Sequence, residues 1–449
     1  MDDRLLVRIY NVGLGDCIYL RVPDDQDHVH ILIDCGNKFS ELELLGQRIA
    51  ELKNELPDAG AGKKRLDLLV VTHPHEDHHK GFEEEFFQDI KIERIWLSPA
   101  FDRLNPKAQG FHALQDAAMR ALVSLSGEAL GDLKELTDEL LSLSKAEAID
   151  MLTTALPEAL GIEAQYVSAD TPAEELQIFQ DPSTKLKVLG PMENIDAYYL
   201  GGDGLMNTSS EISSQGLVDG YNEFFQPSEA VEILPPKNIS PQDFNRLRSR
   251  IHANALALAS LAGHAANNLS VVLLLDWKGH RLLFPGDAEW KSAFKGEVKA
   301  GKTNGSWNVM WQERNAELIQ ALDFLKIGHH GSKNATPWTS KKSKGKVHPI
   351  NDILDHLLPL PPDNQAPTAI AVASTERTNR WPSIPDPELA EEIGRRVANA
   401  VTDYVEDPKR IHVPDNTPQP QRTDLEAQVT QTPETPVPCI DITFAPLSG

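Results

Sequence analysis

Cysteine and long apolar runs are scarce in this sequence of 449 residues. Its three cysteines, Cys17, Cys35 and Cys439, are odd in number and far apart in the chain, which argues against a disulfide framework and a cysteine-based zinc site. No apolar run approaches the roughly 20 residues that cross a bilayer, and no basic segment precedes an apolar core at the start of the chain. We therefore expect a soluble, cytoplasmic protein with no membrane partner.

Basic residues are also in deficit, because 43 Lys and Arg face 67 Asp and Glu, a formal net charge of −24. Such a balance repels polyanions at long range and argues against a general nucleic-acid coat protein. It leaves room for a phosphate substrate at a locally basic site. Lys333 with the lysines of 341–346, and the arginines of 246–250, are either solvated faces or parts of such a site.

The pattern of apolar residues predicts an α/β (α+β) fold. Residues 1–100 and 263–449 are strand-rich, whereas 101–262 predict a largely helical insertion, and 406–437 form a Pro/Thr/Gln-rich excursion. We expect helices at 41–54 and 241–262. Strands are expected at 4–10, 17–22, 29–33, 68–71, 92–97, 185–191, 270–275, 281–284 and 439–444.

Four histidines and a carboxylate follow the apolar run 68–71, within the segment Thr72-His73-Pro74-His75-Glu76-Asp77-His78-His79. Pro74 keeps the preceding residue out of the helical region, so the backbone stays extended through His75. Residues two apart in an extended chain point the same way, so His73 and His75 can reach one ion. Asp77 and His78 follow at the turn into a helix, where they could serve a second ion. The alternative is a polar loop of exposed histidines.

Two later strand ends carry matching residues. Asp287 follows a predicted strand and a glycine, where a carboxylate could bridge two cations or, alternatively, cap a helix. His329 and His330 follow another apolar run, and Asp34 ends a third strand, where it could support metal ligands. Imidazole with carboxylate suits zinc, and also manganese or iron.

These motifs together resemble the metallo-β-lactamase superfamily and, more narrowly, the soluble hydrolase domain of the ComEC/Rec2 competence proteins and its stand-alone relatives. The matching segments are 11–16, 32–36, 72–81, 267–272, 285–287 and 329–333. The resemblance implies a four-layer αββα sandwich with two metal ions, Zn or Mn, at one edge. It also implies that His73 and His75 bind the first ion, Asp77 and His78 the second, and that Asp287 bridges them.

The resemblance leaves two positions open. One of His329 and His330 would complete the second site, and we favour His329. For the first site the superfamily usually supplies a third histidine, where this chain has Asn268, and His264 is the alternative. The segment 296–303 matches the residue pattern of a phosphate-binding loop. That loop needs a buried strand before it, whereas the residues that precede 296 have a polar, helical pattern.

The leading functional hypothesis is a metal-dependent phosphodiesterase or nuclease. Two divalent ions would lower the pKa of a bridging water to about 7 and neutralise charge on the phosphoryl oxygens. The expected catalytic residues are Asp77, Asp287, Ser332 and Lys333, the last two being placed to touch a phosphate of a nucleic acid or nucleotide. One alternative is hydrolysis of a lactone, thioester or lactam. Another is a degenerate site in a module that binds a protein partner through the helical insertion.

Overall fold

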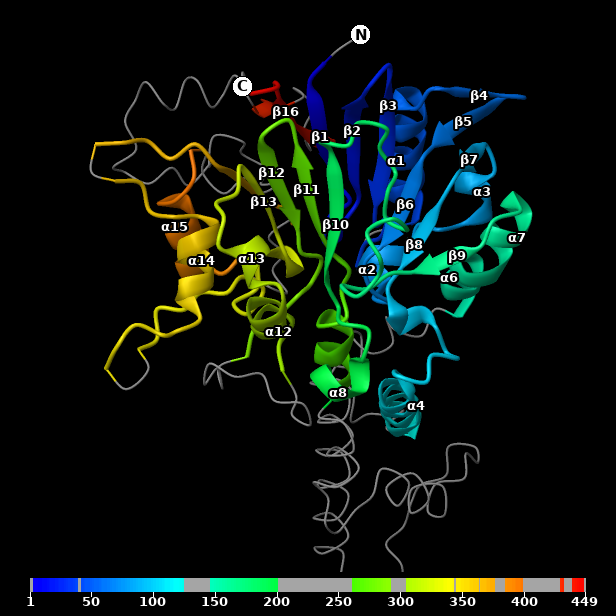
Figure 1. Ribbon diagram of the computed structural model, residues 1–449. Helices are drawn as coiled ribbons and strands as arrows, with labels where there is room; N and C mark the ends of the chain where they lie inside the picture. The colour runs from blue at the N-terminus through cyan, green and yellow to red at the C-terminus, as the bar shows by residue number, and fades with distance from the viewer. Residues whose placement is uncertain are drawn as a thin grey trace, which may run out of the picture.

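The computed structural model describes residues 3–38, 42–124, 146–200, 261–291, 304–342, 345–362, 364–375, 384–398, 429–431 and 438–447. Within these ranges the chain forms mixed sheets of eight, five and three strands, with helices between and around them (Figure 1). This confirms the mixed α/β class expected from the sequence. No helix in the described ranges has both the length and the apolar character to cross a bilayer.

The strands that the sequence predicts are present at or near the expected positions, and the structure adds others. In spatial order the larger sheet contains β15 (Val429–Gln431), β16 (Cys439–Phe444), β1 (Leu5–Tyr10), β2 (Ile18–Asp24), β3 (Asp27–Ile33), β6 (Leu68–Val71), β8 (Ile95–Leu97) and β9 (Ala164–Tyr166). The second sheet contains β10 (Lys185–Gly190), β11 (Val272–Trp277), β12 (His280–Phe284), β13 (Phe324–Ile327) and β14 (Ile370–Ala373). The smallest contains β4 (Asp58–Gly60), β5 (Lys63–Leu66) and β7 (Ile90–Ile92).

Helices lie on either side of the pair of larger sheets (Figure 1). Those near the eight-stranded sheet include α1 (Leu42–Glu55), α2 (Glu76–His79), α3 (Glu84–Phe87), α6 (Ala146–Asp150), the π-helical turn η4 (Met151–Ala155) and α7 (Leu156–Leu160). Those near the five-stranded sheet are α12 (Ser306–Glu313), α13 (Asn315–Leu318), α14 (Asn351–Leu357) and α15 (Pro387–Gly394). The remaining labelled helices are α4 (Gln109–Ser124) and α8 (Ile195–Tyr199), and the 3-10 turns are η1 (Pro99–Phe101) and η5 (His329–Gly331).

Strand β6 shows why its sequence is apolar at every position. Leu68 and Val70 belong to a core cluster that also contains Leu273 and Phe324 of the five-stranded sheet, so this face of β6 packs toward that sheet. Val71 points the other way, into a cluster shared with α1 and α3. Burial on both faces therefore removes the polar alternation that a half-exposed strand would show.

The five-stranded sheet is buried in the same way. Leu273 and Leu275 lie in the cluster between the sheets, whereas Val272 and Leu274 lie in a cluster shared with α12, α14 and α15. Residues of the two large sheets therefore share one core cluster, and α12, α14 and α15 share a second cluster with the five-stranded sheet. Burying one Leu or Ile side chain contributes about 1.5–3 kcal/mol, so these clusters are the main favourable term of folding.

Parallel pairing brings chemically distinct loops to one edge. Strand β6 pairs parallel with β3 and β8, and β13 pairs parallel with β12 and β14. The carboxyl ends of parallel strands lie at the same edge of a sheet, so the segments after β3 and β6 lie together, as do those after β12, β13 and β14. Val271 donates its N–H to the carbonyl of Thr72 at 2.9 Å, which joins the two edges.

Some sequence-based boundaries differ from the structure. The strand predicted over 92–97 is two strands, β7 and β8, because the chain turns at Glu93 and Arg94 and passes from the three-stranded to the eight-stranded sheet. Residues 101–262 were expected to form a largely helical insertion with one strand at 185–191. The structure has that strand as β10 and adds β9, and each of the two extends one of the large sheets. Residues 201–260, and 406–437 except 429–431, lie outside the described residues.

A buried ion pair links the two sheets near this edge. Lys326 of β13 places its ammonium 2.9 Å from the carboxylate of Asp16, which follows β1, and both side chains are almost fully buried. Ser374, after β14, also donates its hydroxyl to Asp16. Burial opposes ionisation of Asp16, but the charge of Lys326 outweighs it and lowers the pKa of this carboxyl. The pair therefore fixes the β1–β2 loop against β13.

We expect Lys326→Met to lower the free energy of unfolding by about 3–5 kcal/mol, because it leaves the Asp16 carboxylate buried without its counter-charge. Urea denaturation measures this loss. The matched control is Lys187→Met, since Lys187 pairs with Asp276 at 2.7 Å but is 34% exposed. The control should lose less than about 1 kcal/mol. Equal losses in the two variants would contradict the role assigned to Lys326.

Candidate metal centre

The segment after β6 is held in place by Asp34, which follows β3. The backbone N–H and the hydroxyl of Thr72 both donate to the Asp34 carboxylate, each at 2.7 Å. His75 is extended, with φ −94° and ψ 145°, and α2 begins at the next residue. The backbone is thus extended through His75, and the helix carries Asp77 and His78 on its first turn.

His73, His75 and Asp287 form a first buried group whose ligand atoms lie within 4.8 Å of one another. His73 Nε2 is 2.8 Å from His75 Nδ1 and 3.7 Å from Asp287 Oδ2. All three side chains are at most 2% exposed. The expected convergence of the two histidines is therefore present, and Asp287 joins them from the other sheet.

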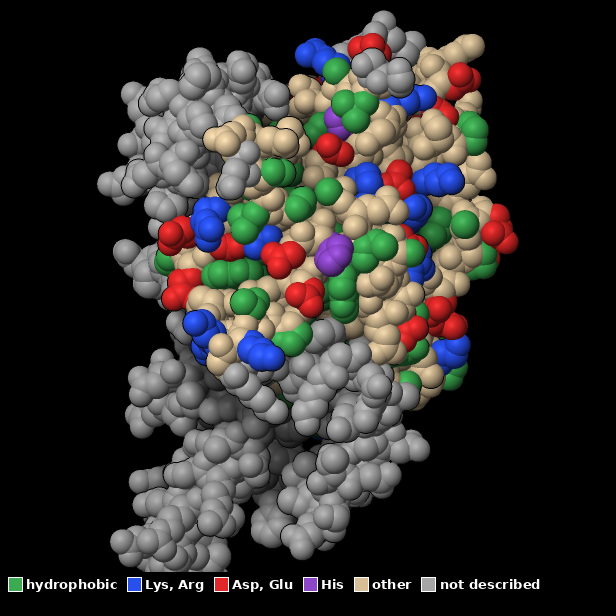
Figure 2. Space-filling view, turned by 60° about the vertical axis from the view of Figure 1, so that its left-hand side comes forward, with side chains coloured by type: hydrophobic (Ala, Val, Ile, Leu, Met, Phe, Trp, Pro, Cys, Tyr) green, Lys and Arg blue, Asp and Glu red, His purple; other side chains and the backbone are tan. Residues whose placement is uncertain are grey.

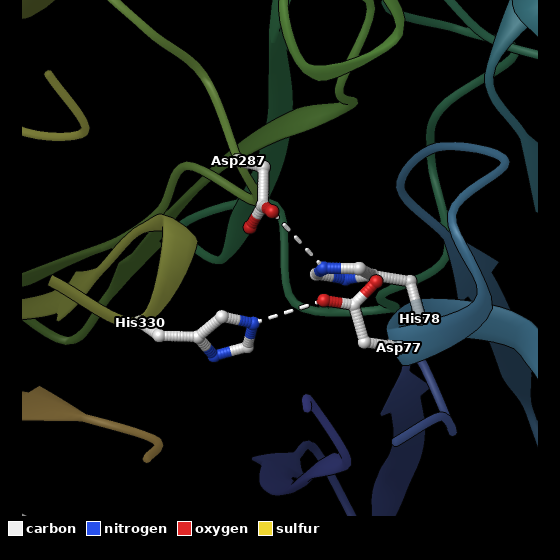
Figure 3. A group of neighbouring side chains, drawn as sticks. All are labelled: Asp77, His78, Asp287 and His330. Carbon is white, nitrogen blue, oxygen red and sulfur yellow. Dashed lines mark hydrogen bonds and ion pairs between the residues drawn. The ribbon is translucent and has the colours of Figure 1, made fainter. Parts of the chain in front are cut away.

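Asp77, His78, Asp287 and His330 form a second buried group (Figure 3). His78 Nε2 lies 3.3 Å from Asp287 Oδ2, and His330 Nε2 lies 3.1 Å from Asp77 Oδ2. Asp77 and His78 come from α2, Asp287 follows β12, and His330 follows β13. The group thus spans both sheets, and Asp287 belongs to it as well as to the first group.

The backbone around Asp287 accounts for its position between the groups. Gly286 has a φ of 53°, and a Cβ there would lie 2.9 Å from Cβ of Ser270, so glycine suits both the conformation and the space. The N–H of Asp287 donates to the hydroxyl of Ser270, and the N–H of His329 donates to Asp287 Oδ1, both at 3.0 Å. Residues 288–291 are not helical, so Asp287 is not a helix cap.

Asp34 supports His78, as the sequence suggested. Its Oδ2 is 2.8 Å from His78 Nδ1. Burial disfavours the charged form of His78, but Asp287 and Asp34 outweigh it and raise the pKa of the imidazole. Asp16 also lies close to Asp34 and His78, but its carboxylate is already paired with Lys326. Asp34 therefore orients the imidazole of His78 and, through this contact, helps to hold α2 in place.

The structure favours His330 over His329, the histidine that we preferred from the sequence. His330 Nδ1 lies 2.9 Å from the carbonyl of Ser374, which directs its Nε2 toward Asp77. His329 Nδ1 lies 3.5 Å from Glu289 Oε1, and its Nε2 lies 4.0 Å from Asp287 Oδ2 without joining either ligand group. Both histidines have positive φ, 43° and 55°. This left-handed backbone breaks the regular alternation from which a side-chain direction could be predicted.

Glu289 is a buried residue of the site that the sequence analysis missed. Its carboxylate contacts His264 Nδ1 and accepts a hydrogen bond from Asn267, both at 2.9 Å. Burial raises the pKa of Glu289, but the contacts with His264 and His329 outweigh it and lower this pKa to about 2. Its contacts come from a distant segment of the chain, so no local pattern in the sequence marked it.

Neither candidate for a third ligand of the first group is directed at it. The imidazole of His264 is 46% exposed and pairs with Glu289. Asn268 accepts the N–H of Ser306 at 2.5 Å and donates its own amide to the carbonyl of His264 at 2.7 Å. The first group is therefore composed of two histidines and the shared carboxylate.

Two predicted phosphate contacts lie away from both groups. Ser332 donates its hydroxyl to Asn334 at 3.1 Å. Lys333 is 53% exposed and lies 3.8 Å from Asp386. The structure thus brings neither side chain to Asp287. The segment 296–303, which matches the phosphate-loop motif, lies outside the described residues.

The donor atoms suit a divalent metal ion. Within the described part of the chain, Asp77 Oδ1 is buried and accepts no hydrogen bond, and His75 Nδ1 is the ring nitrogen that faces His73. Burial and the charge of Lys38 lower the pKa of His75 to about 3, so its imidazole is neutral near pH 7 and can offer a lone pair. Nitrogen and carboxylate donors together suit zinc or manganese.

Comparison with known proteins adds no family assignment. No protein-family model matches the chain, and no curated protein matches it. The relation expected from the motifs therefore remains a proposal, supported by the motifs themselves and by the geometry of the two groups.

Single substitutions of the neighbouring histidines test the second group. We expect the wild-type protein to bind about two divalent ions and His330→Ala about one, because it loses a ligand of this group. His329→Ala should retain about two ions. Elemental analysis after zinc loading measures the difference, with circular dichroism to verify folding. Loss of metal in His329→Ala alone would reverse the assignment.

Asp34 gives a separate test of ligand orientation. Asp34→Asn should lower zinc affinity about 10- to 100-fold, the usual effect of removing a carboxylate that supports a metal-binding histidine. Competition with a chromogenic chelator measures the affinity. Asp67→Asn is the control, because Asp67 precedes β6, at the end of that strand opposite the metal groups. Its carboxylate accepts a hydrogen bond from the backbone N–H of His30 at 2.8 Å. Unchanged zinc affinity in Asp34→Asn would show that His78 needs no such support.

Proposed function

We propose that this protein is a metal-dependent hydrolase of the metallo-β-lactamase superfamily, acting on a phosphodiester. The core cluster shared by the two large sheets, with helices on either side of the pair, supports the four-layer αββα sandwich of that superfamily. The position of the histidine and aspartate groups at one edge of the sheets supports the same relation.

The observation that carries the proposal is the sharing of Asp287 by two buried ligand groups. One carboxylate at the junction of two such groups is the arrangement that a pair of divalent ions requires. When bound, such ions lower the pKa of water to about 7 and neutralise charge on phosphoryl oxygens. Two hydrogen bonds hold Asp287 in position: its N–H donates to the hydroxyl of Ser270, and its carboxylate accepts from the N–H of His329.

The residues of the two groups have distinct roles in this proposal. His73 and His75 hold one ion, and Asp77, His78 and His330 hold the other. Asp34 and the carbonyl of Ser374 keep the imidazoles of His78 and His330 in place. These supports limit the reorganisation that the site needs during the reaction, which is the basis of electrostatic catalysis.

The surface supports a small substrate over a long polyanion. The net charge is −24, and acidic and basic side chains are intermixed on the face shown in Figure 2. A nucleotide or short phosphodiester suits this surface better than extended nucleic acid. The same acidic surface also suits the second candidate, hydrolysis of an uncharged lactone, thioester or lactam.

Asp287→Asn should lower kcat/KM for bis-p-nitrophenyl phosphate by about 1,000-fold or more. The shared carboxylate holds both ions, and each tenfold in rate corresponds to about 1.4 kcal/mol of transition-state stabilisation. Asp276→Asn is the control, because Asp276 is an acidic residue of β11 that pairs with Lys187 instead of the site. Zinc- or manganese-loaded wild-type protein that hydrolyses neither this ester nor DNA would refute the proposal.

A further inference from the structure

Asp16 is a buried acidic residue near the second metal group that already has an internal cation as its partner. Its carboxylate oxygens lie 2.9 and 3.0 Å from the ammonium of Lys326. The side chain is 1% exposed, and its donor atoms lie close to those of Asp34 and His78. A metal ion bound by Asp16 would have to displace the ammonium. The contribution of Asp16 to the site therefore lies in the residues that it holds in place.

The carboxylate of Asp16 is linked to His330 through Ser374. The hydroxyl of Ser374 donates to Asp16, and the carbonyl of Ser374 lies 2.9 Å from His330 Nδ1. A carbonyl can only accept, so in the neutral imidazole Nδ1 carries the hydrogen and Nε2 offers a lone pair toward Asp77. Ser374 is fully buried, so water does not replace Asp16 as the acceptor of its hydroxyl. Asp16 thus helps to fix the carbonyl that orients His330.

The backbone of Asp16 holds the other half of the second group. Its N–H donates to the carbonyl of Asp77 at 3.0 Å, and its carbonyl accepts the N–H of Gly36 at 3.0 Å. The three segments touch, because a Cβ on Gly15 would collide with Gly36, and a Cβ on Gly36 would collide with the backbone of Asp77. A displacement of Asp16 therefore moves the start of α2 as well.

Asp77 and His330 need such a link because they come from opposite sheets. Their side chains nevertheless approach to 3.1 Å, between His330 Nε2 and Asp77 Oδ2. Asp16 contacts α2 through its N–H and the segment after β14 through its carboxylate. His73 and His75 of the first group lie instead on one extended segment, so the distance between them does not depend on how the sheets dock.

We propose that Asp16 is a positioning residue of the second metal group, and that its link to Ser374 sets how tightly this group holds its ion. Donors that are fixed at the right separation bind a metal ion without further ordering of side chains. Loss of the link lets His330 move relative to Asp77, which weakens the second ion and leaves the first in place. The inference concerns the metal centre, and only its effect on hydrolysis rests on the proposed function.

Ser374→Ala tests the link, because it removes the hydroxyl and keeps the ion pair of Lys326 with Asp16. Zinc titration of the full chain against a chromogenic chelator should show one affinity lowered about 10- to 100-fold and the other changed less than about threefold. Ser98→Ala is the matched control, because Ser98 is also fully buried and donates its hydroxyl to the carbonyl of Leu269 at 2.6 Å. The control should keep both affinities. Ser374→Cys, of similar size and with a weaker donor, replaces Ser374→Ala if circular dichroism shows that the latter does not fold.

A double-mutant cycle identifies the ion that is weakened. In His330→Ala, the added Ser374→Ala should change the affinity of the remaining ion less than about threefold, because the imidazole on which Ser374 acts is absent. In His73→Ala, which disrupts the first group, the same addition should lower the remaining affinity about 10- to 100-fold. Equal losses of both ions in Ser374→Ala, no loss of either, or a loss that persists in His330→Ala would overturn the inference.

Hydrolysis gives a second readout. With bis-p-nitrophenyl phosphate, the zinc concentration for half-maximal rate should rise about 10-fold or more in Ser374→Ala, while kcat at saturating zinc stays within about threefold, because no ligand is lost. Wild-type protein that binds two zinc ions and cleaves no ester refutes the hydrolase, and the zinc titrations still decide the role of Asp16. Wild-type protein that binds fewer than two ions overturns the inference.

Discussion

Burial of several carboxylates at one edge of two packed sheets is the constraint on which this structure depends. Taking a carboxylate out of water costs several kcal/mol unless a cation or hydrogen-bond donors compensate for it. The partners come from distant segments, so the loops cannot move independently without exposing or unpairing a charge. The four carboxylates, each at most 1% exposed, are Asp16, Asp34, Asp77 and Asp287.

The same constraint explains why the site is preformed. Lys326 of the five-stranded sheet forms an ion pair with Asp16. Asp34 and Thr72 both follow strands of the eight-stranded sheet, and Thr72 donates a hydrogen bond to Asp34. Parallel pairing of β6 with β3 and β8 then fixes the position along the sheet edge at which α2 begins. Because the strands and their supporting hydrogen bonds determine the positions of the imidazoles, little ordering of side chains remains to oppose metal binding.

Local patterns in the sequence predicted the parts of the site that follow strand ends. The apolar run 68–71 and Pro74 indicated an extended segment carrying His73 and His75, and the structure has both. Ser374 and Glu289 were missed because their importance comes only from contacts with distant segments. His329 was preferred over His330 because two adjacent residues after one strand look equivalent until their positive φ values are known.

The order of the site residues along the chain has a consequence for biosynthesis. His73 to His78 are translated early, but Asp287 and His330 follow β12 and β13, which are made much later. A chain still attached to the ribosome therefore has the first imidazoles without the carboxylate that joins the two groups. In the proposed hydrolase, the reactive centre closes only when the second sheet docks on the first. In that proposal the metal groups are complete only in the assembled fold.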